Sequence, residues 1–196
     1  MAEPYTTDDI MLAVANALDA WSRIEFDLEG IFIAVSGMDH DRGSVVMASI
    51  VALEARLAVC NNLIERSAFS GSSKLFWGRF YNKVRKEMKK RNELAHFTII
   101  RPGSLGPSEA KLMPYFTMGR VAMANGGNLI ELNAADITAR GERFAQLAAA
   151  LRWFFGQLND ELGKPLAIRA PATDLVRHFL RPVDPTPIEN APQSPP

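Results

Sequence analysis

Apolar residues recur with the 3.6-residue period of an α-helix along four long segments of this chain, and this spacing constrains the fold more than any other feature. The clearest stripe is heptad-like and consists of Ile10, Val14, Leu18, Trp21, Leu28, Phe32 and Val35. The expected helices run from caps at Thr6, Thr7 and Asp8 to about Val35, from Gly43 to Arg66, from Ser72 to Phe97, and from caps at Asn133 and Asp136 to Leu162. The predicted fold class is therefore mainly α, a four-helix bundle.

A small β insertion is expected between the third and fourth helices, over about residues 98–132. Phe97–Ile100 has the composition of a strand, and a turn at Asn125–Gly127 separates two further extended segments. Together these signals predict a small antiparallel hairpin, with a mobile loop between Gly103 and Lys111. Its position directly after the third helix would let it shape access to a site at the end of that helix.

The helical domain is expected to span residues 1–164 and to be followed by a flexible tail, residues 165–196. Eight of the twelve prolines of the chain lie in that tail, and proline-rich polar segments bury too little apolar surface to fold alone. One short amphipathic piece, Ala172–Leu180, either docks on the bundle or remains free.

Three of the expected apolar stripes are each interrupted by one charged residue: Glu25, Arg56 and Arg91. Arg91 falls in the same stripe as Trp77 and Val84, where a buried guanidinium needs a carboxylate partner or a functional role. In one interpretation Glu25 pairs with Arg56 and fixes the register of the bundle. In the other, Glu25 holds Arg91 or steadies a histidine near it. The sequence leaves both open.

A line of polar side chains follows one flank of the third helix at i, i+4, i+7 and i+11 spacing; it consists of Arg85, Lys89, Asn92 and His96. Such a flank, with Arg91 beside it, offers an anion two cations, an amide and an imidazole. For Arg85 and Lys89 we weigh phosphate contacts equally with simple solvation. Arg91 and His96 point about 140° apart on a straight helix, so their convergence needs a long reach or a loosened helix end.

Composition excludes several classes of function. Lys and Arg number 22, as do Asp and Glu, so contact with nucleic acid has to rest on local patches. No paired-cysteine or His-x-x-x-His spacing and no phosphate-binding glycine loop occurs in the sequence, so neither a metal nor a cofactor is expected. A single cysteine, no charged-then-apolar leader and no long apolar run predict a cytoplasmic protein without membrane contact.

The Arg91-Asn92-x-x-x-His96 motif, near the end of a helix in a small helical domain, resembles the Arg-x(4–6)-His signature of the HEPN superfamily over roughly Thr7–Gly163. The resemblance implies a homodimer whose two facing motifs form a metal-independent endoribonuclease site. It further implies His96 as general base, Arg91 on the scissile phosphate and Asn92 as an orienting group, with Glu25 in support.

Members of this superfamily act as phage-defence or toxin effectors, and some are controlled by an antitoxin partner. In some toxins that partner modifies a tyrosine two residues after the histidine. Thr98 occupies that position here, so this mode of control is not supported.

A non-catalytic function is the main alternative: a dimeric adaptor in which Glu25, Arg91 and Asn92 form a structural polar network. A nucleotide-binding module without turnover is a weaker possibility. The fourth helix is apolar over a broad arc that includes Trp153 and Phe155. This breadth suggests either a homodimer interface or a wider core within one chain.

Overall fold

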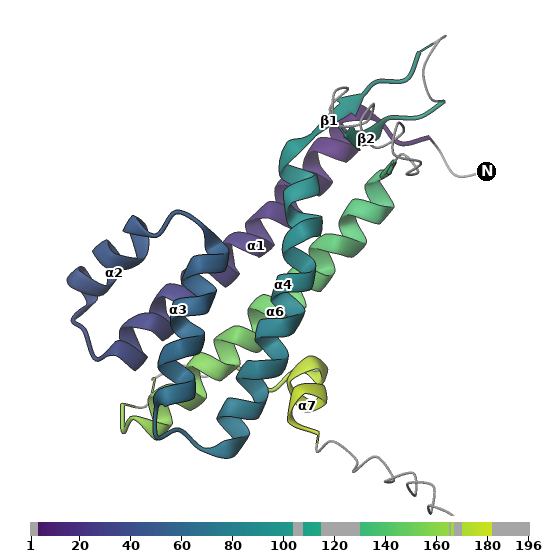
Figure 1. Cartoon of the computed structure of the whole chain (residues 1–196). Helices are drawn as coiled ribbons and strands as arrows, with labels where there is room; N and C mark the ends of the chain where they lie inside the picture. Colours follow the sequence, from purple (N-terminus) through teal and green to yellow (C-terminus); the bar gives the residue numbers. More distant parts are fainter. Residues whose placement is uncertain (1–3, 104–107, 115–129, 165, 167–169, 182–196) are drawn as a thin grey trace, which may run out of the picture.

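The computed structural model describes residues 4–103, 108–114, 130–164, 166 and 170–181, and it is mainly helical, as the sequence predicts. In these ranges six helices and one antiparallel strand pair form an elongated bundle (Figure 1). Their bounds are α1 Thr7–Ser36, α2 His40–Ser49, α3 Leu53–Arg66, α4 Gly71–His96, β1 Phe97–Ile100, β2 Lys111–Pro114, α6 Ala134–Glu161 and α7 Asp174–Leu180. None of the helices in these ranges is long and apolar enough to cross a membrane.

The two longest helices, α1 and α6, lie side by side and run in the same direction (Figure 1). Both begin with a capping box, formed by Thr6 with Asp9 in α1 and by Asn133 with Asp136 in α6. The contacts between them advance in step along both chains: Ala17 meets Gly141, Trp21 meets Phe144, Asp27 meets Arg152 and Gly30 meets Phe155. Matching order along both helices is possible only for a parallel pair. The chain therefore returns through α4 before α6 begins.

The predicted single helix Gly43–Arg66 is wrong, because the structure divides it into α2 and α3. Ile50 and Ala52 adopt extended backbone conformations, and Val51 between them is 92% exposed. Arg56 Nε donates to the Ile50 carbonyl at 2.6 Å, which satisfies an acceptor that the helix break leaves open. The break turns α2 against the end of α1, where a Cβ at Gly43 would lie 2.4 Å from Ile33 Cγ1.

The buried face of α4 is rotated from the predicted stripe. Its buried residues are Ser73, Phe76, Trp77, Phe80, Val84, Glu87 and Leu94. Glu87, at 2% exposed, is therefore the charged residue in the seam, and it accepts a hydrogen bond from Lys90 Nζ at 3.0 Å. The Arg91 side chain remains 34% exposed, so its predicted place on the buried seam is wrong. The rotation places Phe76 against Phe154 of α6 and Phe179 of α7.

The predicted antiparallel hairpin is confirmed in outline between α4 and α6. Strand β1 pairs with β2 in a register that runs from Phe97 opposite Pro114 to Ile100 opposite Lys111. Leu132 extends the pairing through a bridge to Leu112. The predicted turn at Asn125–Gly127 lies outside the described residues, as does part of the loop between the strands.

The short amphipathic segment near the C-terminus docks on the bundle as α7. Its Phe179 ring packs edge-on against Phe76 with ring centroids 5.3 Å apart. Arg79 of α4 donates to the carbonyl oxygens of Phe179 at 2.7 Å and Arg181 at 2.5 Å, so it holds the end of α7. Of the predicted flexible tail, residues 165, 167–169 and 182–196 lie outside the described part of the chain.

Gly141 of α6 tests how closely α1 and α6 are packed, and Gly78 of α4 provides the matched control. A Cβ at Gly141 would lie 3.2 Å from both Cα and Cβ of Ala17, whereas a Cβ at Gly78 of α4 meets nothing within 4 Å. We expect Gly141→Leu to lower the free energy of unfolding by about 1–3 kcal/mol through overpacking. The matched Gly78→Leu change should raise it by roughly 0.5 kcal/mol, because leucine favours helix over glycine. Chemical denaturation measures both, and equal stability of the two variants would contradict the tight contact.

Candidate functional site

Arg91 and Glu25 come together from α4 and α1. Arg91 Nη2 lies 3.9 Å from Glu25 Oε1, and that oxygen also accepts a hydrogen bond from Trp21 Nε1 at 3.1 Å. Of the two pairings that the sequence left open, the structure therefore has Glu25 beside Arg91. Arg56 forms its hydrogen bond with the Ile50 carbonyl instead.

A pocket of about 370 Å³ opens beside this pair, at the break between α2 and α3. Its lining consists of Glu25, Val51, Ala52, Leu53, Glu54, Arg56, Met88, Arg91 and Asn92. Arg91 Nη1 donates to Asn92 Oδ1 at 3.3 Å, so the two motif residues contact each other at the pocket. Arg91 Nε is buried and has no hydrogen-bond partner among the described residues. The site thus places a partly exposed guanidinium beside an amide.

The structure does not bring His96 to this pocket. His96 is the last residue of α4, its side chain is exposed, and it is absent from the pocket lining. Of the two predicted phosphate contacts, Arg85 Nη2 pairs with Glu54 Oε1 at 2.9 Å, and Lys89 is exposed. Within one chain, Arg91 and Asn92 of the motif therefore line the pocket, whereas His96 lies outside it at the end of α4.

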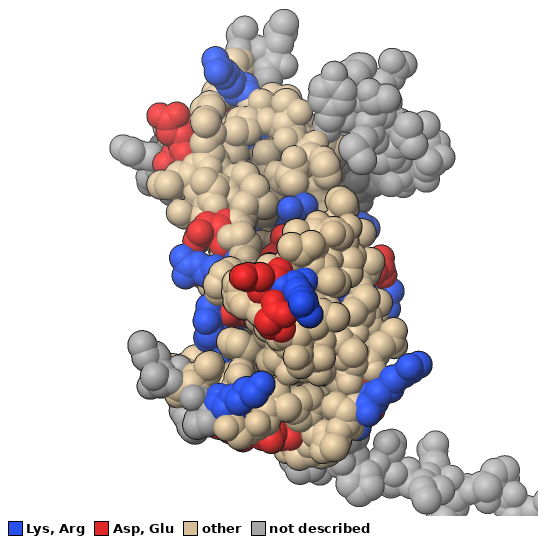
Figure 2. Space-filling view, turned by 90° about the vertical axis from the view of Figure 1, so that its left-hand side faces the viewer, with Lys and Arg blue, Asp and Glu red and all other residues tan. Residues whose placement is uncertain are grey.

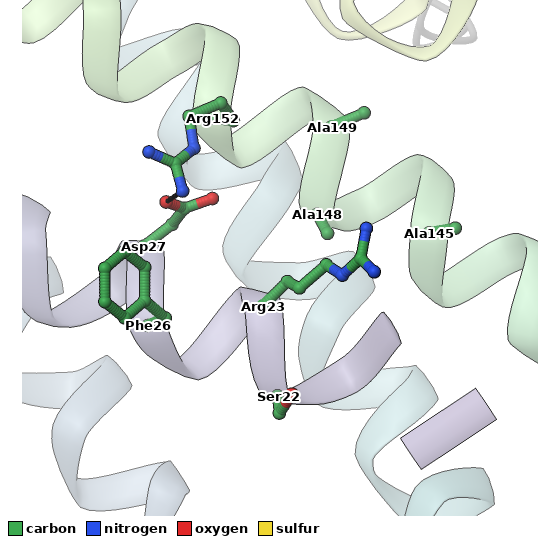
Figure 3. Close-up of a pocket in the computed structure, with 8 residues that line it drawn as sticks. All are labelled: Ser22, Arg23, Phe26, Asp27, Ala145, Ala148, Ala149 and Arg152. Carbon is green, nitrogen blue, oxygen red and sulfur yellow. Dashed lines mark ion pairs between the residues drawn. The ribbon is translucent and has the colours of Figure 1, made fainter. Parts of the chain in front are cut away.

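A second pocket, of about 490 Å³, lies between α1 and α6 and was missed by the sequence analysis (Figure 3). Its lining consists of Ser22, Arg23, Phe26, Asp27, Ala145, Ala148, Ala149 and Arg152. Asp27 is 2% exposed, and its Oδ1 lies 2.7 Å from Arg152 Nη2. Burial raises the pKa of Asp27 from its usual 3.8 to about 6, although the charge of Arg152 opposes the shift. An aspartate beside the apolar stripe of α1 was the only sequence signal for this pocket.

Cys60 and the possible metal ligands do not form a further reactive site among the described residues. Cys60 is buried against α1, where its Sγ lies 3.8 Å from the Leu28 carbonyl, and burial raises the pKa of its thiol to about 12. Across the described ranges, no three histidine, cysteine or carboxylate side chains are placed to hold a metal ion.

The face of the molecule that carries α2 has no large patch of a single charge. Figure 2 shows that most of this face is uncharged and that its acidic and basic side chains are intermixed.

Comparisons with protein-family models, with curated proteins and with solved structures found no match for this chain.

The buried carboxyl of Asp27 should make stability depend on pH. Because its pKa is higher in the folded protein, the folded state binds this proton more tightly, and stability falls as pH rises from about 4 through 6. Wild type should therefore lose stability relative to Asp27→Asn, by at most about 3 kcal/mol between roughly pH 4 and pH 7. Urea denaturation across this range measures the difference. Asp8→Asn, at an exposed position of α1, is the control and should track wild type.

Proposed function

We propose that this protein is a metal-independent endoribonuclease of the HEPN type that acts as a homodimer in the cytoplasm. The observation that carries the proposal is the pairing of Arg91 with Asn92 at an open pocket, five residues before an exposed His96 on the same helix. A role as a toxin or phage-defence effector, with an antitoxin or another regulatory partner, belongs to the same proposal.

The chemistry needs a base, a cation and an acid. His96 takes the proton of the ribose 2′-hydroxyl, whose oxygen attacks the phosphorus while the bond from phosphorus to the 5′-oxygen breaks. A second imidazole protonates the leaving 5′-oxygen, and the product is a 2′,3′-cyclic phosphate. An imidazole with an ordinary pKa near 6.5 suits both proton transfers near neutral pH.

Arg91 would bind the scissile phosphate. Its side chain is partly exposed and lines the pocket. A guanidinium fork matches two phosphate oxygens and stabilises the charge that builds up on them during attack. Glu25 sits 3.9 Å from Arg91 and is itself held by Trp21, so it would orient the guanidinium without saturating it.

A second copy of the chain would complete the site. His96 does not line the pocket that contains Arg91 and Asn92, and the two residues project about 140° apart around α4. His96 of the partner subunit, carried by an equivalent helix end, would approach this pocket across a two-fold axis. The same operation would supply the second imidazole that the reaction needs.

The contacts of Arg91 also favour a second candidate function. Arg91 already contacts both Glu25 and Asn92 within one chain, as expected for a structural network in a non-catalytic dimeric adaptor. The two functions differ in what Arg91→Ala does. An adaptor should lose thermal stability or dimerisation, whereas a nuclease should lose cleavage at nearly unchanged stability, since Arg91 is partly exposed.

Cleavage in excess EDTA tests the nuclease directly. We expect wild type to cut mixed single-stranded RNA, to leave DNA intact and to produce 2′,3′-cyclic ends. His96→Ala should reduce the rate by about 10²–10⁴-fold, because it removes the general base. His40→Ala, another exposed histidine, should cleave like wild type. Absence of cleavage by wild type, with a lower melting temperature for Arg91→Ala, would favour the adaptor.

A further inference from the structure

A hollow of about 550 Å³ opens between α4 and α7 and gathers cationic side chains. Helix α7 lies beside the first half of α4 (Figure 1). The lining of the hollow consists of Arg79, Asn82, Lys83, Lys86, His178, Phe179 and Arg181. Four of these residues are lysines or arginines, and no carboxylate of the described residues lines the hollow. Because the whole chain has 22 basic and 22 acidic residues, this local excess of positive charge favours an anionic ligand.

Three of the four cations have no carboxylate partner in the described part of the chain. The hydrogen bonds of Arg79 go to backbone carbonyls of α7 and Arg181. Lys86 and Arg181 are exposed, and neither forms an ion pair with a described residue. Lys83 Nζ lies 3.9 Å from Glu87 Oε1, an oxygen that already accepts a hydrogen bond from another lysine. The hollow therefore keeps positive charge that no described acid neutralises.

Arg79 is the cation that the fold holds in place. Its Nη1 donates to the carbonyl oxygens of Phe179 at 2.7 Å and Arg181 at 2.5 Å, whereas its Nε and Nη2 have no partner among the described residues. The Phe179 carbonyl is one of the acceptors left open at the end of α7, so Arg79 also offsets its partial negative charge. A guanidinium held in this way offers parallel donors to phosphate oxygens, and the nearby lysines add point charges.

The cations continue beyond the hollow as a row along α4. Arg79, Lys83, Lys86 and Lys90 follow one another at i, i+4, i+7 and i+11, so they lie on one side of the helix over roughly 16 Å. From Arg79 to Lys90 the chain has six basic residues and one acid, Glu87, which is buried. A row of this length is too long for one phosphate group and suits a chain of successive phosphates. It runs from the hollow towards the end of α4 that carries the motif.

We propose that the hollow and the row beyond it bind the phosphate backbone of single-stranded RNA and direct the strand along α4. The choice of RNA rests on the proposed nuclease function, and the surface shares no lining residue with the pocket at Arg91. Lysine and arginine side chains that contact phosphates carry no sequence information, so binding depends on salt and strand length and little on base sequence. Single-stranded DNA binds in the same way, because these contacts do not involve the 2′-hydroxyl.

The first experiment measures binding of the full-length wild-type protein to a labelled 2′-O-methyl octanucleotide, which lacks the hydroxyl needed for cleavage, by fluorescence anisotropy. We expect a Kd of about 10⁻⁴–10⁻⁶ M near physiological salt. The logarithm of the affinity should fall with the logarithm of the salt concentration with a slope of about −2, as for about three neutralised phosphates. A trinucleotide should bind at least about five-fold more weakly, because it brings fewer phosphates to the row. Equal binding of the two lengths, or no binding at low salt, would overturn the proposal.

Two variants then locate the surface. Lys86→Gln and Arg181→Gln each remove an exposed cation of the hollow that has no ion-pair partner among the described residues, so the melting temperature should not change. Each should weaken octanucleotide binding by about five-fold at roughly 0.1 M salt and make the salt slope shallower by about 0.7. Lys164→Gln removes an exposed lysine outside the hollow and should bind like wild type. Wild-type affinity in both folded variants would refute the surface.

These measurements also separate the surface from the nuclease. Weaker binding by the two variants, with no cleavage of ordinary RNA by wild type, would support the surface and refute the nuclease. Cleavage by wild type, with unchanged affinity in both variants, would support the nuclease and refute the surface. A single-stranded DNA octanucleotide should bind within about three-fold of the RNA analogue, because both present the same phosphates. A larger preference for the RNA analogue would show contacts other than phosphate and overturn the proposal.

Discussion

The close parallel packing of α1 on α6 is the constraint on which the rest of the molecule depends. Small residues at the contact let the backbones approach, as where Gly141 faces Ala17. Large aromatic rings fill the adjoining layers, as in the edge-on contact of Trp21 with Phe144 at 4.9 Å. Because two parallel helices need a connection that returns to the starting end, α4 has to run back along them. The motif at the end of α4 is therefore carried to the end of the bundle where β1 and β2 lie (Figure 1).

Ion pairs strengthen this arrangement, because arginines of α6 pair with acidic side chains of α4 and α1. Arg140 pairs with Glu93 of α4 at 2.6 Å, Arg143 lies 3.9 Å from buried Glu87 of α4, and Arg152 pairs with Asp27 of α1 at 2.7 Å. Removing one member of such a pair would leave a buried charge uncompensated. The two pairs between α4 and α6, together with the packing of Phe76, hold the rotation of α4 about its axis, and this rotation leaves Arg91 on the rim of a pocket and out of the core.

The candidate site shows how far sequence reasoning reaches. The motif residues and the possible partnership of Glu25 with Arg91 follow from helical spacing, because both residues interrupt apolar stripes. The spacing did not identify which side of α4 is buried, since two overlapping stripes differ by only a fraction of a turn. Nor did it reveal Asp27 and Arg152, because nothing in the sequence links residues 125 positions apart; only the packing of two helices brings them together.

By itself, the sequence determined the mainly helical class, the caps of α1 and α6, the approximate extent of α1, α4 and α6, the strand after the motif and the amphipathic character of the segment that became α7. These depend on local periodicity and on side chains that bond to nearby backbone. Tertiary structure decided the break between α2 and α3, where Ile50 and Ala52 leave the helix and Arg56 satisfies the freed Ile50 carbonyl. It also decided which charges are buried and where pockets open. Those outcomes depend on contacts between distant segments, and local propensity carries no information about them.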